Sequence, residues 1–108
     1  MSNWLTVATL DELPVGTVRK FDVDGFEIAI ANTPEGVFAV DDTCTHAEVS
    51  LSEGELNGCL LECWMHGATF DVRTGNPTTP PAVTPLATYP VQIVGDADKA
   101  EIQIKVSE

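Results

Sequence analysis

Two short stretches, Cys44-Thr45-His46 and Cys63-Trp64-Met65-His66, decide how this chain folds. Each stretch offers one thiolate and one imidazole, and the sixteen residues 47–62 separate them. The chain has two histidines and three cysteines in all, and the two stretches use four of these five residues. Isolated structural residues would rarely fall into two such pairs. The spacing therefore predicts a four-ligand metal site on two loops that meet in space.

Both zinc and iron accept this set of ligands. Zinc binds two sulfurs and two nitrogens in a tetrahedron, but the usual zinc-finger spacing pairs cysteine with cysteine and histidine with histidine. In a [2Fe-2S] cluster with two cysteines on one iron and two histidines on the other, each mixed loop supplies one ligand to each iron. The mixed order favours the binuclear cluster, and a structural zinc-binding module is the alternative.

The pattern C-x-H, sixteen residues, C-x-x-H and then Gly67 resembles the Rieske iron-sulfur motif. The likeness covers nearly the whole chain, which resembles the small Rieske-type ferredoxins of bacterial aromatic-ring-hydroxylating dioxygenase systems. The resemblance implies one Rieske-type [2Fe-2S] cluster, with one pair of ligands on the buried iron and the other on the outer iron. The implied ligands are Cys44 and Cys63 for the buried iron, and His46 and His66 for the outer one.

The rest of the chain predicts an all-β fold. Short alternating runs bounded by turn residues recur along it, and the capping box at residues 9–12 predicts a single helical turn. The expected strands are residues 4–8, 17–23, 26–31, 37–40, 67–71, 91–93 and 102–106. The resemblance implies one Rieske domain over residues 1–108. Its antiparallel β-sandwich base would carry a small inserted cluster-binding subdomain at about residues 42–84.

Three features of the inserted part carry further expectations. Asn57-Gly58 lies between two short apolar runs, which predicts a type I′ hairpin that links the two ligand loops. Cys59 follows this turn, and we expect it to be a small, partly buried apolar residue without a redox role. Pro80 and Pro81 match in position a proline-bearing loop that covers the cluster in the family, with a plain surface turn as the alternative.

Two residues after the second ligand loop bear on the reduction potential. High-potential Rieske proteins, which resemble this chain there, carry serine and tyrosine where it has Ala68 and Phe70. Neither side chain can donate a hydrogen bond to sulfur, which would stabilise the reduced state. Those proteins also have a cysteine pair at the positions of Val49 and Met65. We therefore expect a potential near the low end of the Rieske range, about -150 mV.

The charge pattern bears on the partners. The net charge is -12, and residues 21–72 contain eleven acidic residues and no lysine or arginine. This excludes nucleic acid as a partner and favours docking on basic protein surfaces, although solubility alone is an alternative explanation. Trp64 and Met65 could form an apolar centre for a transient contact. Four glutamates near the ligand loops could guide the encounter: Glu48, Glu53, Glu55 and Glu62.

The resemblance implies a soluble one-electron carrier with no catalytic residues. It would link a flavin-containing, NAD(P)H-dependent ferredoxin reductase to a terminal oxygenase component that dihydroxylates aromatic compounds. We expect a monomer, and a cytoplasmic location because the chain shows no signal peptide and no membrane span of about eighteen apolar residues. An oxygenase site would need two more histidines than the chain has. The alternative is a Rieske-like small subunit of a larger reductase, such as an assimilatory nitrite reductase.

Overall fold

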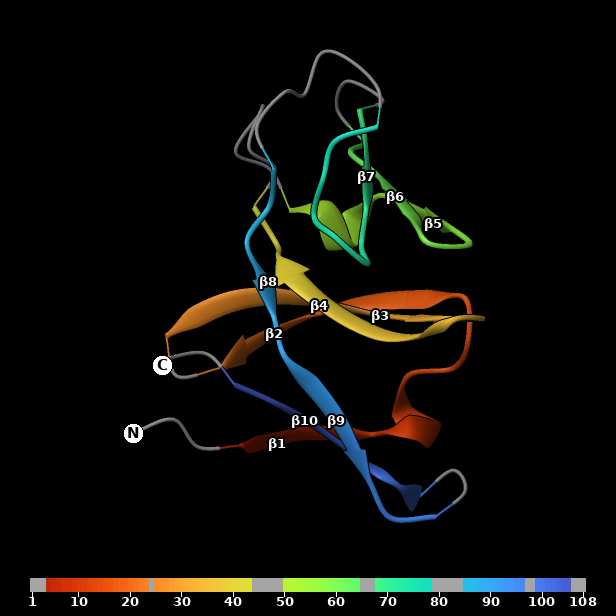
Figure 1. Cartoon of the computed structure of the whole chain (residues 1–108), viewed down its shortest axis with the longest axis vertical. Helices are drawn as coiled ribbons and strands as arrows, with labels where there is room; N and C mark the ends of the chain where they lie inside the picture. Colours follow the sequence, from red (N-terminus) through yellow and green to blue (C-terminus); the bar gives the residue numbers. More distant parts are fainter. Residues whose placement is uncertain are drawn as a thin grey trace.

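The computed structural model describes residues 4–23, 25–43, 50–64, 68–78, 85–96 and 99–105. This part of the chain forms three antiparallel sheets, which confirms the predicted all-β fold. Figure 1 shows the sheets one above another along the longest axis of the molecule. Two single 3-10 turns, η1 (Leu10–Glu12) and η2 (Leu51–Glu53), lie between strands. Within the described ranges, no helix is long and apolar enough to cross a membrane.

The strands divide into a lower, a middle and an upper sheet in the view of Figure 1. The lower sheet has the order β1 (Leu5–Thr9), β10 (Glu101–Ile104), β9 (Val91–Val94). The middle sheet has the order β2 (Thr17–Val23), β3 (Phe26–Thr33), β4 (Gly36–Asp41), β8 (Thr88–Tyr89). The upper sheet has the order β5 (Glu55–Asn57), β6 (Leu60–Glu62), β7 (Thr69–Asp71). The upper sheet thus falls between β4 and β8 in the sequence.

Strand β3 is buried on both of its faces, because successive side chains of a strand point in opposite directions. Ile28 and Ile30 belong to the core that the middle sheet shares with the lower sheet. Ala29 and Ala31 belong to the core that it shares with the upper sheet. All four side chains are fully buried. The small alanines allow the upper sheet to lie close to the backbone of β3.

The turn of the upper hairpin lies one residue further along than predicted. Asn57 pairs with Leu60, so the two connecting residues are Gly58 and Cys59. Gly58 takes the left-handed conformation, with a φ of 60°, which glycine adopts without strain. The shift turns Cys59 into the core, where its thiol lies 3.5 Å from the Thr33 hydroxyl. Cys59 is therefore buried and forms no disulfide, in agreement with its expected packing role.

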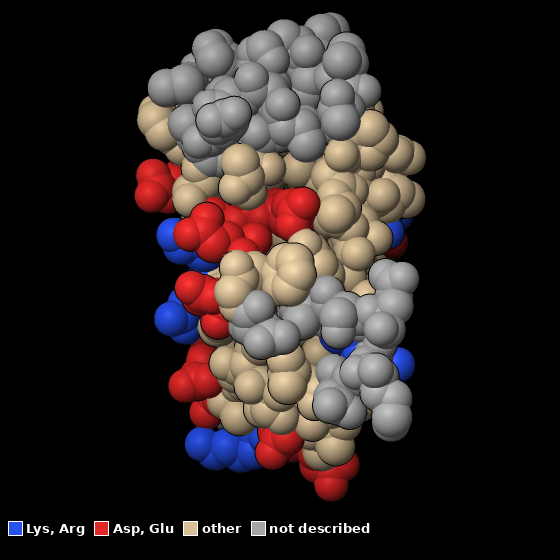
Figure 2. Space-filling view, turned by 90° about the vertical axis from the view of Figure 1, so that its left-hand side faces the viewer, with Lys and Arg blue, Asp and Glu red and all other residues tan. Residues whose placement is uncertain are grey.

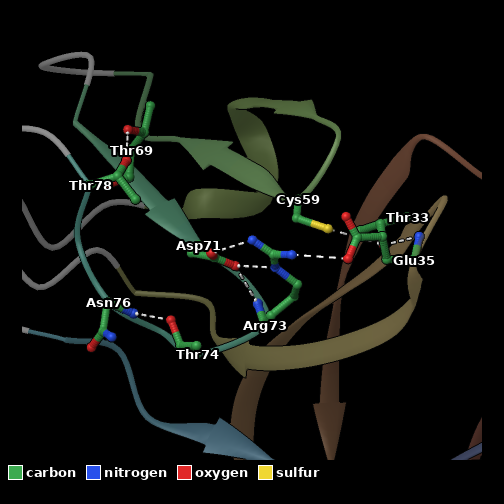
Figure 3. A network of polar contacts seen from close by, with 9 residues as sticks. All are labelled: Thr33, Glu35, Cys59, Thr69, Asp71, Arg73, Thr74, Asn76 and Thr78. Carbon is green, nitrogen blue, oxygen red and sulfur yellow. Dashed lines mark hydrogen bonds and ion pairs between the residues drawn. The ribbon is translucent and has the colours of Figure 1, made fainter.

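Arg73 ties the upper sheet to the turn between β3 and β4 (Figure 3). Its Nε and Nη2 donate to the two carboxylate oxygens of Asp71 at 3.0 and 2.9 Å, and its Nη1 donates to Glu35 Oε1 at 2.9 Å. The hydrogen bonds from Arg73 hold the pKa of the Asp71 carboxyl below its usual range. Since Arg73 is partly exposed, this link contributes orientation more than stability.

Strand β8 was not predicted, because two residues are too few to form a sequence pattern. It pairs with Ala39 and Val40 of β4 and so returns the chain to the middle sheet. The Tyr89 hydroxyl of β8 donates a hydrogen bond to Asp41. Burial, reinforced by this hydrogen bond, raises the pKa of Tyr89. The contact fixes β8 against the end of β4, from which the first ligand loop begins.

Packing of the upper sheet on β3 makes Ala29→Leu destabilising. The larger side chain would overfill the core between the two sheets, so we expect the free energy of unfolding to fall by about 1–3 kcal/mol. Urea unfolding followed by circular dichroism measures the change. Ala87→Leu is the matched control, because Ala87 is exposed and the same substitution should change the stability by less than about 0.5 kcal/mol. An Ala29→Leu protein as stable as the wild type would contradict this packing.

Candidate metal centre

Cys63 is the predicted ligand that the structure describes. It follows β6, is fully buried, forms no disulfide and belongs to the core between the upper and middle sheets. The other predicted ligands, Cys44, His46 and His66, lie outside the described residues, as do Val49, Met65, Pro80 and Pro81. Within the described ranges no three His, Cys, Asp or Glu side chains are grouped as a metal site. The four-ligand set therefore stays a prediction.

The second ligand segment starts and ends at hydrogen-bonded backbone. The N–H of Cys63 donates to the carbonyl of Ala68 at 2.6 Å, directly after the paired residues Glu62 and Thr69. Six residues, 63–68, therefore connect β6 to β7, and four of them, 64–67, lie between the hydrogen-bonded Cys63 and Ala68. The Cys63 side chain is fully buried, whereas the next side chain, Trp64, is 50% exposed. This arrangement suits an inner sulfur ligand that is followed by a surface contact.

The first ligand segment also leaves from and returns to paired backbone. Thr43 and Ser50 form an isolated antiparallel bridge, and the N–H of Leu51 donates to the carbonyl of Asp42 at 2.6 Å. Residues 44–49, which contain the first ligand pair, lie between these contacts. The segment is thus anchored on one side by the end of β4 and on the other by η2.

Gly54 joins the supports of the two ligand segments. It follows η2, and a Cβ atom at this position would lie 1.8 Å from the carbonyl oxygen of Glu62, the residue before Cys63. Only glycine allows such a close approach of two backbones. The exit of the first segment therefore lies directly against the entry of the second. A lone glycine before a strand gave no signal of this contact in the sequence.

A third segment begins beside the second ligand segment. The N–H of Thr78 donates to the carbonyl of Thr69 at 2.8 Å, the two threonine hydroxyls are in contact, and Phe70 forms a bridge with Pro77 (Figure 3). The next residues, 79–84, contain the predicted proline loop and lie outside the described part. The described contacts bring the start of this segment to β7.

The surroundings of Cys63 are apolar. Ala68 and Phe70 are fully buried in the same core, and neither side chain has a hydrogen-bond donor. A hydrophobic shell of this kind limits water and lowers the local dielectric constant around a metal ligand. A buried cysteine without a disulfide at the base of a short loop fits one cysteine ligand of a [2Fe-2S] cluster.

Among the described residues, the surface near the two ligand segments is acidic, and Trp64 is a large exposed apolar side chain on it. Glu53 and Glu55 are exposed, and Glu62 is partly exposed, whereas Glu48 lies outside the described residues. The ion pairs found within the described ranges do not involve these three glutamates. Figure 2 shows acidic side chains gathered on the side of the molecule that lies to the left in Figure 1.

Comparison with known proteins identifies the family. The family model of the Rieske [2Fe-2S] domain matches residues 3–90. The ferredoxin component of the naphthalene 1,2-dioxygenase/salicylate 5-hydroxylase systems of Ralstonia sp. is 40% identical over 91 residues, which are 84% of this chain and 88% of the relative. The 3-phenylpropionate/cinnamic acid dioxygenase ferredoxin subunit of Photorhabdus laumondii is 44% identical over 105 residues, covering 96% and 95%.

Solved structures agree with this result. This chain is similar to a chain in the solved complex of reduced oxygenase and oxidized ferredoxin in carbazole 1,9a-dioxygenase. The TM-score is 0.83 and the sequence identity is 34%, with 94% of this chain and 91% of the solved chain covered. The family match and the ferredoxin relatives indicate one Rieske-type [2Fe-2S] cluster. The chain belongs to the Rieske [2Fe-2S] domain family, with the ferredoxins of aromatic dioxygenase systems as its relatives.

Proposed function

We propose that this chain is the electron-carrying ferredoxin component of an aromatic-ring-hydroxylating dioxygenase system and is not itself an enzyme. It takes single electrons from a flavin-containing, NAD(P)H-dependent reductase and passes them to a terminal oxygenase, in the cytoplasm. The observation that carries this proposal is the buried Cys63 at the junction of two anchored loops, in a chain that resembles ferredoxin components along most of its length. The solved complex of a related ferredoxin with its oxygenase supports the acceptor.

The proposed ligands divide into an inner and an outer pair. The bound cluster supplies a site that gains or loses one electron. Full burial of Cys63 supports cysteines on the inner side, and the exposed side chain that follows it supports an outer side near His66. We assign Cys44 and Cys63 to the inner iron and His46 and His66 to the outer one. The two histidines then lie nearest to a docked partner.

The surface around Trp64 is our candidate for partner docking. We call the described glutamates near the ligand segments, Glu53, Glu55 and Glu62, the acidic rim. An exposed aromatic side chain with such a rim matches the usual design of a protein interface, in which an apolar centre is surrounded by polar groups. The charge of -12 favours a partner with lysines and arginines around a complementary apolar patch. Weak, rapidly reversible docking suits a carrier that must leave each partner after one electron.

The first test is electron paramagnetic resonance on the dithionite-reduced protein, with iron and sulfide counted on the same sample. We expect a rhombic signal of a mixed-ligand cluster and about two irons and two sulfides per chain. Replacing His66 with alanine should abolish this signal, whereas replacing Cys59, which packs beside Thr33, should preserve it. A silent protein with one bound zinc would refute electron transfer. A stable large complex on purification would favour a reductase subunit instead.

The apolar surroundings of Cys63 predict a reduction potential of about -150 mV. Ala68→Ser and Phe70→Tyr should each raise it, because a hydroxyl that reaches a sulfur stabilises the reduced state. Redox titration followed by circular dichroism measures the three potentials. Phe21→Tyr is the control, since it adds the same hydroxyl to a partly buried ring in the lower core. A wild-type potential well above zero, or no response in both variants, would contradict this account.

Docking through Trp64 predicts that Trp64→Ala slows reduction of the oxygenase several-fold at every ionic strength. Val15→Ala is the control, because Val15 is a more exposed apolar side chain outside this surface. Raising the ionic strength from about 0.01 to 0.15 M shortens the Debye length from about 30 to 8 Å, so steering by the acidic rim should weaken for all three proteins. Stopped-flow kinetics measures both effects. A flat salt response would remove the steering role of the glutamates.

A further inference from the structure

The outer face of the upper sheet carries two exposed apolar side chains. Leu61 on β6 and Cys63, two positions later, are fully buried. Because successive side chains of a strand point in opposite directions, Leu60, Glu62 and Trp64 lie on the other side of this segment, away from the core. Leu60 is 40% exposed and Trp64 is 50% exposed. These two side chains thus lie at the ends of one exposed row, with Glu62 between them.

The outer face also includes residues of both neighbouring strands. β5 and β7 pair with β6 on its two sides. Residues that lie directly opposite each other in a sheet point to the same side of it, so the register assigns the members of this face. All of them are exposed or partly exposed, so no described element covers the face as a whole. The outer face consists of Glu55, Asn57, Leu60, Glu62, Thr69 and Asp71, and Trp64 continues it past the end of β6.

The charges on the outer face indicate which kind of molecule fits it. Arg73, the only lysine or arginine in residues 21–98, is bound to Asp71 of this face and to Glu35 at the turn between β3 and β4 (Figure 3). Glu55 is exposed and takes part in none of the ion pairs found within the described ranges. A second copy of this chain would bring acidic side chains against acidic side chains. The face therefore fits a protein that presents lysine or arginine beside an apolar patch.

The two apolar side chains are close enough for one partner to contact both. Leu60 and Trp64 are four residues apart, which is about 13 Å along an extended strand. An interface of ordinary size, about 800 Å² on each partner, extends over a longer distance than this. Trp64 directly follows Cys63, so a partner on this face also lies beside the second ligand segment.

We propose that the terminal oxygenase docks along the outer face of the upper sheet, with Leu60 as a second apolar anchor besides Trp64. The oxygenase then lies against the side of the upper sheet, and its contact extends from the second ligand segment toward Arg73. Its lysine and arginine side chains lie next to Glu55, and its apolar patch covers the row along β6. This inference rests on the proposed function, since it assigns a contact surface to the acceptor of the carrier.

Leu60→Lys and Ile93→Lys test the proposal as a matched pair. Ile93 lies on β9 of the lower sheet, at the other end of the longest axis, and is 42% exposed (Figure 1). Both variants thus replace an almost equally exposed aliphatic side chain and change the net charge equally. Leu60→Lys should raise the Kd for the purified oxygenase about fivefold or more, measured by isothermal titration calorimetry with both proteins oxidised. Ile93→Lys should keep the wild-type Kd, and equal Kd values for the two variants would overturn the proposal.

Iron content and midpoint potential separate weaker docking from damage to the metal centre. Leu60 lies on the opposite side of β6 from Leu61, so Leu60→Lys should retain the iron content and the potential of the wild type. Leu60→Ala decides the question if the lysine variant loses iron or does not fold, because it removes the anchor without adding a charge. Its Kd should exceed that of the control Ile93→Ala several-fold. Equal Kd values for these two alanine variants would overturn the role of Leu60.

Sedimentation of the wild-type protein alone tests the other occupant of this face, a second copy of the chain. We expect a monomer. A dimer that Leu60→Lys dissociates would assign the face to self-association and overturn the proposal. A wild-type protein that does not reduce the oxygenase would refute the proposed function, and this inference with it. A wild-type protein that reduces the oxygenase, with equal behaviour of Leu60→Lys and Ile93→Lys, would overturn this inference alone.

Discussion

Burial of β3 on both faces is the constraint on which the rest of the structure depends. Ile28 and Ile30 fill the core toward the lower sheet, and Ala29 and Ala31 leave a shallow surface on the other side. An upper sheet of three short strands buries too little apolar surface to be stable alone. Resting on the alanine face of β3, it shares the core of the middle sheet and extends that core to Cys63. The proposed metal centre thus depends on a strand well before Cys44, its first proposed ligand.

The ligand segments are held by regular backbone and not by their own length. Thr43 pairs with Ser50, and Cys63 with Ala68, so each segment is closed at its base by strand-like hydrogen bonds. Gly54 then brings the two bases together, because its lack of a Cβ atom lets η2 contact the backbone before Cys63. Sites built on rigid elements keep their geometry better than sites on free loops. A carrier gains from this, since little reorganisation accompanies each electron.

Local patterns of the sequence predicted the strands and most turns, because alternation and turn residues act over a few neighbours, whereas the four ligands stay a prediction from the motif. Features that depend on distant partners were not predictable in this way. Alternation of Ile28 with Ala29 indicates a strand but not that a second sheet covers the alanines. The hairpin turn lies one residue further along than predicted, and Cys59 in this turn contacts Thr33, which lies 26 positions earlier. Pairing with β4 alone defines β8.

The arrangement also combines burial of the proposed cysteine ligand with access of a partner protein to the surface beside it. A thiolate ligand needs dry, apolar surroundings, whereas electron transfer needs a short path to the partner. With Cys63 as the proposed inner ligand, the fold meets both needs within two residues, since Cys63 is fully buried and Trp64 is half exposed. Arg73 is the only lysine or arginine in residues 21–98, and it is already bound to Asp71 and Glu35. Its charge is thus largely neutralised locally, so a partner that docks beside Trp64 must supply the cations itself.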